Sequence, residues 1–194
     1  MLVLLPIFIF SIVLHEVAHG LMALKFGDDT AQRAGRLTLN PLPHIDLIGS
    51  ILIPVMGMLL GGMIIGWAKP VPVDFDRLNE KETIYVSLAG VAVNFLMATA
   101  AGLALRLLPL GSGYLPAVIT YIVFINLMLG VFNLLPVPPL DGWRIWGIWL
   151  PENVRWQIEA NALLYMALLF IILPLLPIIP LVRMLFFALT GVRL

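Results

Sequence analysis

Long runs of apolar residues, separated by short polar loops, dominate the chain. Five runs meet or approach the roughly 20 residues that a helix needs to cross a bilayer. They cover residues 1 to about 24, 47–68, 83–105, 114 to about 136, and 160–182. The pattern predicts an all-α polytopic membrane protein with about four to five transmembrane helices.

The second run differs from the others because glycine and proline interrupt it, at Gly49, Pro54, Gly57, Gly61, Gly62 and Gly66. If this run crosses the membrane, the 11 lysines and arginines divide six to five between the two sides; if it enters and leaves on one side, they divide eight to three. Cytoplasmic loops collect lysine and arginine. We therefore predict a re-entrant hairpin here, with the eight-charge side cytoplasmic.

Two polar segments show the alternation and the prolines of extended chain. In "AGRLTLNP" (34–41) Leu37 and Leu39 alternate with polar residues, and in "KPVPVDF" (69–75) Pro70 and Pro72 keep the backbone extended. These segments predict a small β-sheet at the membrane surface. Further along, prolines punctuate the last apolar run, which we expect to span once and then break into a short interfacial helix ending near Thr190.

Composition agrees with membrane insertion and narrows the chemistry. Hydrophobic residues make up 61% of the chain and charged residues 11%, against about 25% charged in soluble domains. The net charge is zero and no basic block occurs, so nucleic-acid binding has no support. With no cysteine, any metal must be held by histidine and carboxylate. The first run lacks a basic leader and a cleavage site, so we expect a retained helix and not a signal peptide.

The first apolar run contains "HEVAH", in which His15 and His19 are four residues apart. On a helix these histidines lie on one face and can reach one metal ion, and Glu16 lies beside them. In H-E-x-x-H sites the histidines bind zinc and the glutamate takes a proton from zinc-bound water. An ionisable residue in a membrane helix costs at least about 2.5 kcal/mol. The alternative is a polar cluster that neighbouring helices satisfy.

A hydrolytic zinc site needs a third protein ligand. His44, Asp46 and several other acids lie in polar loops, whereas Asp141 ends a long uncharged run in the proline-rich segment "FNLLPVPPLDGWRIW". Proline there prevents regular helix, so an acid can be held at membrane depth. Under the re-entrant topology Asp141 emerges on the same side as the two histidines. Under a five-span topology it emerges on the opposite side.

Three motifs carry a resemblance to a known family. "HEVAHG", "SLAGVAVNF" and "FNLLPVPPLDGWRI" resemble the signatures of the site-2 protease family of intramembrane zinc metalloproteases, and the resemblance runs from about residue 7 to 148. "GRLTLNPLPHIDLIGS" and "GWAKPVPVD" are similar to a compact prokaryotic branch without PDZ or CBS domains. The resemblance implies one zinc ion per chain, bound by His15, His19 and Asp141. It also implies that Glu16 is the general base and that the amides of Asn94 and Asn133 line the site.

The resemblance also implies one intramembrane metalloprotease domain over residues 1–194, with a catalytic core at about 1–150 and C-terminal helices at about 158–192. It implies hydrolysis of peptide bonds in or near transmembrane helices of membrane-protein substrates, that is, regulated intramembrane proteolysis. The expected location is the cytoplasmic membrane of a prokaryote, with the active site opening toward the cytoplasm. The expected partners are transmembrane-helix substrates and lipid, and no nucleic acid. Whether the chain forms a homo-oligomer is left open.

Two departures from the family pattern bear on activity. Val91 stands where the family has proline, and Trp143 stands where it has a second glycine. The bulky ring of Trp143 would narrow the cleft or turn Asp141, which keeps open a catalytically inactive relative that binds membrane helices. A zinc transporter is the other alternative. It would need polar residues along a metal path, and beyond Asn94, Asn126 and Asn133 the remaining runs offer few.

Overall fold

The computed structural model describes residues 3–46, 49, 52, 68–109, 111 and 113–193. Within these ranges the regular structure is helical and no strand occurs. Three helices are long and apolar enough to cross a membrane: α1 (Leu4–Lys25), α4 (Glu80–Leu107) and α5 (Tyr114–Asn133). A bent pair, α7 (Glu152–Ala160) and α8 (Ala162–Ile172), provides a fourth if it counts as one span. The predicted all-helical architecture is confirmed for the described residues.

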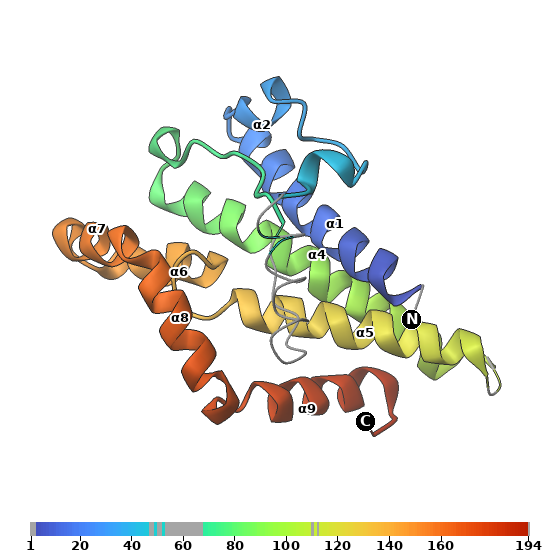
Figure 1. Ribbon diagram of the computed structural model, residues 1–194. Coiled ribbons are helices and arrows are strands. Elements are labelled where there is room, and N and C mark those ends of the chain that lie inside the picture. The colour runs from blue at the N-terminus through green and yellow to red at the C-terminus, as the bar shows by residue number, and fades with distance from the viewer. Residues whose placement is uncertain are drawn as a thin grey trace.

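Helix α4 packs against both α1 and α5 (Figure 1). It begins with a capping box, in which the Asn79 side chain accepts the Glu82 N–H at 3.0 Å and the Glu82 carboxylate accepts the Asn79 N–H at 2.9 Å. Helix α9 (Ile178–Thr190) packs on α4 and α5. The buried core shared by these three helices is apolar and consists of Ala98, Val123, Leu127, Val131, Ile178, Val182 and Phe186.

The predicted surface sheet was wrong for the described residues. Segment 34–41 forms turns between α2 (Thr30–Arg33) and the 3₁₀ helix η1 (Leu42–His44), and segment 69–75 is irregular up to η3 (Phe75–Arg77). The Thr38 hydroxyl accepts the Asn40 N–H, and the Asn40 side chain accepts the Leu42 N–H, both at 3.1 Å. These local bonds compete with a strand ladder. Apart from residues 49, 52 and 68, the predicted re-entrant hairpin at 47–68 lies outside the described residues.

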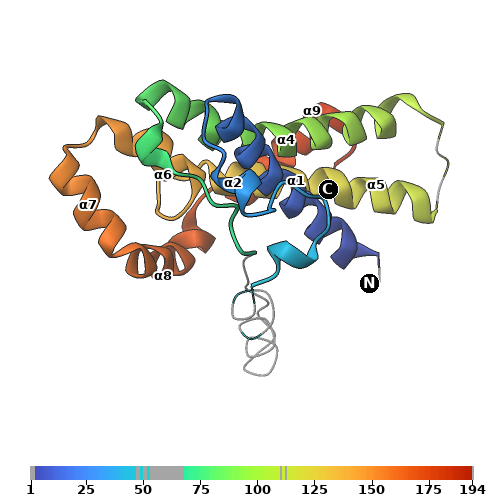
Figure 2. The same ribbon diagram turned by 90° about the horizontal axis from the view of Figure 1, so that it is seen from above.

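The C-terminal part consists of short helices with breaks between them. Helix α6 (Asp141–Trp146) leads through η4 (Gly147–Trp149) into α7, and α8 leads through η5 (Leu173–Leu175) into α9. Helices α7 and α8 meet at 74° and lie at one end of the molecule (Figure 2). The expected break in the last apolar run is confirmed at η5. Helix α9 ends at Thr190, where Gly191 takes a left-handed conformation with φ of 75°.

Candidate metal centre

His15 and His19 lie one helical turn apart on α1 and share its buried face. The two residues are 5% and 7% exposed, and their ring centroids are 4.6 Å apart. The two Nε2 atoms are 3.0 Å apart. The four-residue spacing in "HEVAH" therefore directs both imidazoles to one point, as the helical period requires.

Asp141 reaches the same point from the start of α6. Its Oδ2 lies 3.1 Å from His15 Nε2, and its Oδ1 lies 3.3 Å from His19 Nε2. The three residues offer ligand atoms that all lie within 4.8 Å of one another. Within the described ranges this is the one cluster of three such side chains. The structure thus brings together the three ligands predicted from the sequence, although 121 residues lie between His19 and Asp141.

The approach of α6 depends on Gly142, the residue that follows Asp141. A Cβ atom at this position would overlap the backbone carbonyl groups of Leu134 and Leu135. Backbone atoms cannot move aside as the end of a side chain can, so the segment after α5 can pass this closely only over glycine. The "DG" pair therefore joins a metal-binding carboxylate to a residue that allows the close contact.

The remaining nitrogen of each histidine contacts an oxygen. His19 Nδ1 lies 2.7 Å from the backbone oxygen of Val86, and His15 Nδ1 lies 2.6 Å from the side-chain oxygen of Asn94. A carbonyl oxygen only accepts, so each ring donates from Nδ1, and its Nε2 is left to face the other two candidate ligands. Protein ligands to metals commonly show this arrangement of the outer hydrogen bond.

The donor set fits a zinc ion. Two imidazole Nε2 atoms and a carboxylate face one another at 3.0–3.3 Å, a spacing that suits a cation bound between them. Zinc–nitrogen bonds of about 2.0–2.1 Å in a tetrahedron place neighbouring ligand atoms about 3.3 Å apart. Although Asp141 Oδ2 is close to His15, this buried atom has no hydrogen-bond partner in the described part of the chain. Histidine and carboxylate are ligands that zinc accepts.

Helix α4 passes close to the two histidines at Gly90. A Cβ atom there would lie 2.7 Å from His15 Cε1 and would overlap His19 Nε2. The neighbouring Val91, which replaces the family's proline, is 3% exposed and forms part of the apolar interior. The helix continues without interruption through this position.

Glu16 leaves α1 next to His15 and contacts the segment that precedes α4. Its Oε2 accepts the backbone N–H of Val71 at 2.7 Å. Its other oxygen accepts no hydrogen bond from any residue that the structure describes. The contact with Val71 holds one end of the carboxylate and leaves the other available as a proton acceptor.

The two asparagines predicted to line the site occupy different positions. Asn94 is fully buried, and its side chain is shared between His15 and Asn126, which is also fully buried. Asn94 therefore lies behind the histidine ring, and not at a surface that a substrate could reach. Asn133 is half-buried and donates to the Leu129 oxygen of its own helix at 3.0 Å. Its contact with substrate stays a prediction.

The other candidate residues are placed as follows. His44 is 2% exposed, and its Nε2 lies 3.0 Å from the backbone oxygen of Thr38 within its own loop, apart from the three clustered ligands. Trp143 is 6% exposed, and its Nε1 donates to Glu159 Oε1 at 2.9 Å. The indole nitrogen is therefore directed to α7.

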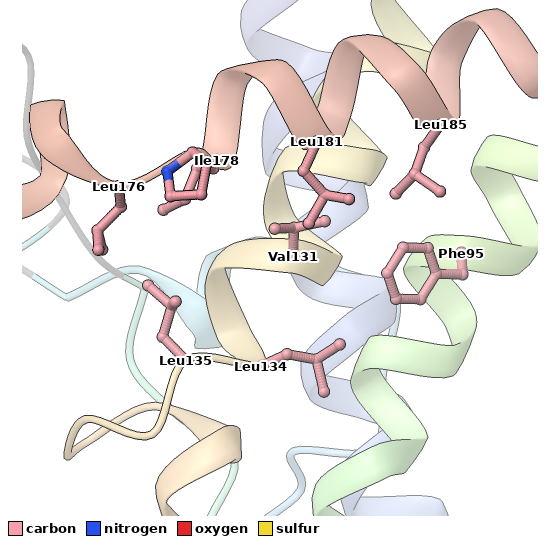
Figure 3. Close-up of a pocket in the computed structure, with 9 residues that line it drawn as sticks. Phe95, Val131, Leu134, Leu135, Leu176, Ile178, Leu181 and Leu185 are labelled. Atoms are coloured by element: carbon pink, nitrogen blue, oxygen red, sulfur yellow. The ribbon is translucent and has the colours of Figure 1, made fainter.

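An apolar hollow of about 400 Å³ lies between α5 and α9, beside Phe95 of α4 (Figure 3). Its lining contains none of the candidate metal ligands, so the hollow is separate from the candidate metal centre. The lining residues are Phe95, Val131, Leu134, Leu135, Leu176, Pro177, Ile178, Leu181 and Leu185.

The chain is similar to one family model and to several known proteins. A family model described as Peptidase family M50 matches residues 109–176. YwhC of Bacillus subtilis is 39% identical over 176 residues, which cover 84% of this chain and 77% of YwhC. Rip2 of Mycobacterium tuberculosis is 34% identical over 166 residues, which cover 83% of this chain and 63% of Rip2. MJ0392 of Methanocaldococcus jannaschii is 24% identical over 135 residues, covering 70% of this chain and 30% of MJ0392.

The names of these three relatives all contain the words zinc metalloprotease. No solved structure matches the chain. The extent and identity of the match to YwhC, together with the family model, show that the chain belongs to peptidase family M50, the site-2 protease family. With its apolar helices, it is a multi-pass membrane protein.

Proposed function

We propose that this chain is a zinc metalloprotease that hydrolyses peptide bonds in or near transmembrane helices of membrane-protein substrates. The observation that carries the proposal is the convergence of two buried histidines, His15 and His19, with Asp141; the ligand atoms of the three residues lie within 4.8 Å of one another. These residues would hold one zinc ion. The family and the names of the relatives support the same reaction class.

Zinc bound here supplies a Lewis acid and a water whose pKa falls to about 7. Glu16 is the general base, because it is the carboxylate next to His15 and keeps one oxygen without a hydrogen bond from the described residues. It removes a proton from the attacking water and then returns the proton to the leaving amine. Val71 positions Glu16 through its N–H, and Asn94 positions His15.

The proposed location is the cytoplasmic membrane of a prokaryote, with the site opening toward the cytoplasm. This orientation is supported by the eight-to-three division of lysine and arginine under the re-entrant topology. The proposed partners are lipid and transmembrane-helix substrates. A substrate helix must unwind locally, because its hydrogen bonds shield the peptide groups. A second copy of the chain is a further candidate partner.

The test uses purified full-length protein in detergent, as wild type and as Glu16→Gln. Zinc content is measured for both, together with cleavage of a membrane protein that carries one transmembrane helix. We expect about one zinc per chain in both proteins and cleavage only by the wild type. Zinc in both with cleavage in neither, across a panel of such helices, would favour a transporter or an inactive helix-binding relative. Absence of zinc from the wild type would overturn the proposal.

A further inference from the structure

A chain of buried hydrogen bonds connects His15 to two other helices. Asn94 of α4 contacts His15 Nδ1 at 2.6 Å, and its Nδ2 donates to Asn126 Oδ1 of α5 at 2.9 Å. Asn126 Nδ2 donates to Ser11 Oγ of α1 at 3.0 Å. Ser11, Asn94 and Asn126 are each 0% exposed. The chain therefore begins and ends on α1, one turn apart, and passes through α4 and α5.

The direction of these hydrogen bonds is determined at one end. Asn126 Nδ2 also lies 2.9 Å from the backbone oxygen of Ile122, which can only accept. The NH₂ group of Asn126 must face that oxygen, so its own oxygen faces Asn94 and accepts from it. Asn94 in turn presents its oxygen to His15, which must donate from Nδ1. Reversing the two amides would place the Asn126 oxygen against the Ile122 oxygen.

We infer that Asn126 and Ser11 are positioning residues, which act through Asn94 to hold His15 with its proton on Nδ1 and its Nε2 lone pair toward the metal. This inference rests on the proposed zinc role of His15. The Ser11 hydroxyl stabilises the arrangement, because it donates to the Ile7 oxygen at 2.9 Å and so accepts from Asn126. His19 needs no such chain, since its Nδ1 contacts a backbone oxygen directly.

A simpler role for these amides is to join the helices, as polar side chains do in membrane bundles. The two roles predict different results. A residue that only joins helices affects the stability of the protein with and without metal. A residue that positions His15 affects zinc affinity beyond any change in stability, because outer-shell partners of metal-bound histidines typically contribute 10–100-fold to metal affinity.

The test compares Asn126→Leu and Ser11→Ala with wild type and with Thr190→Val. Thr190 is a suitable control because its hydroxyl is buried and donates to its own helix, at the Phe186 oxygen of α9. Zinc affinity is measured by competition with a chelator, and thermal unfolding is measured on the metal-free proteins. We expect Asn126→Leu to weaken zinc binding about tenfold or more. We expect a smaller loss for Ser11→Ala and none for Thr190→Val.

A spectroscopic measurement separates the two roles further. The chain has three histidines, so the Nδ1 proton of His15 can be assigned in zinc-loaded protein labelled with ¹⁵N in its imidazoles. We expect this resonance to shift in Ser11→Ala and Asn126→Leu and to stay in place in Thr190→Val. An unchanged resonance and unchanged zinc affinity in folded Ser11→Ala and Asn126→Leu would overturn the inference; if Asn126→Leu does not fold, Ser11→Ala decides. Failure of the wild type to bind zinc would instead overturn the proposed function.

Discussion

The indole nitrogen of Trp143 donates a 2.9 Å hydrogen bond to Glu159, which joins α6, the helix that begins at Asp141, to α7. Trp143 stands two residues after Asp141 and is 6% exposed. The family pattern has glycine at this position, and the sequence suggested that a bulky ring would disturb the ligand. The structure shows the ring buried and its polar atom paired with α7, while Asp141 keeps its contacts with both histidines.

This hydrogen bond predicts an energetic coupling between Trp143 and Glu159. Glu159→Ala should lower the free energy of unfolding by about 1 kcal/mol in the wild-type background, because it leaves the indole N–H without its acceptor. The same substitution in a Trp143→Phe background should have almost no effect, since the donor is already absent. Denaturant titrations of the four proteins in detergent measure the coupling. Equal effects of Glu159→Ala in the two backgrounds would show that the contact contributes no stability.

A second prediction concerns Gly90, where α4 passes close to the histidines. Gly90→Ala should abolish or strongly weaken zinc binding, because the new Cβ would lie 2.7 Å from His15 Cε1 and overlap His19 Nε2. Helix propensity alone favours alanine over glycine by about 1 kcal/mol, so helix α4 itself should be retained. Metal analysis of the purified variant, together with its circular dichroism, tests both statements.

Gly102→Ala is the matched control for this prediction. Gly102 lies on the same helix, and a Cβ there would approach Leu189 of α9 to 2.9 Å, at a position apart from the metal ligands. This variant should lose some stability and keep its zinc. If both alanine variants lose zinc to the same degree, the effect comes from general disruption of α4 and not from the crowding of the histidines.

The metal ligands could be predicted from the sequence because most of the information is local. His15 and His19 lie one turn apart on any helix, and Asp141 was placed on the same side by charge counting. The partners of the histidines could not be predicted in this way. Whether Asn94 and Asn126 meet depends on the rotation and register of α4 against α5, which packing of the apolar core determines. No periodicity in either helix encodes that register.

The surface sheet, in contrast, was predicted from a local pattern and was wrong within the part of the chain that the structure describes. Leu37 and Leu39 alternate as strand residues do, yet alternation says nothing about competing side-chain hydrogen bonds. Thr38 and Asn40 bond to backbone groups two residues away, and Arg36 turns inward to donate to the Lys69 oxygen at 2.7 Å. These contacts hold the segment in place without a neighbouring strand. Segments 34–41 and 69–75 therefore meet through a side chain where the pattern indicated paired backbones.

A third prediction concerns acid stability and Asp28, which follows α1. Burial alone would raise the pKa of this carboxyl, but hydrogen bonds from the Thr30 hydroxyl, the Thr30 N–H and the Asp74 N–H outweigh it and lower the pKa below its ordinary 3.8. A lowered pKa in the folded state contributes stability that is present above 3.8 and is lost as the pH falls through the folded-state value.

Asp28→Asn should therefore destabilise the protein at neutral pH, because the amide nitrogen cannot accept the Asp74 N–H. The difference in unfolding temperature between wild type and Asp28→Asn should narrow as the pH is lowered below about 4. Thermal unfolding in detergent between pH 7 and pH 3 measures it. A difference that stays constant over this range would mean that ionised Asp28 adds nothing to stability.

The last prediction concerns the backbone N–H of Val71, which holds Glu16 at 2.7 Å. Val71→Pro removes this donor and leaves the metal ligands untouched, so zinc content should stay at the wild-type level. The turnover number should fall about tenfold or more, since a proton acceptor must be held within hydrogen-bond reach of its donor and general base catalysis contributes about 10²–10⁴-fold. Val71→Ala keeps the N–H and shortens a side chain that is 6% exposed, so it controls for altered packing. If Val71→Ala loses as much activity as Val71→Pro, packing of the valine side chain, and not its N–H, governs the position of Glu16.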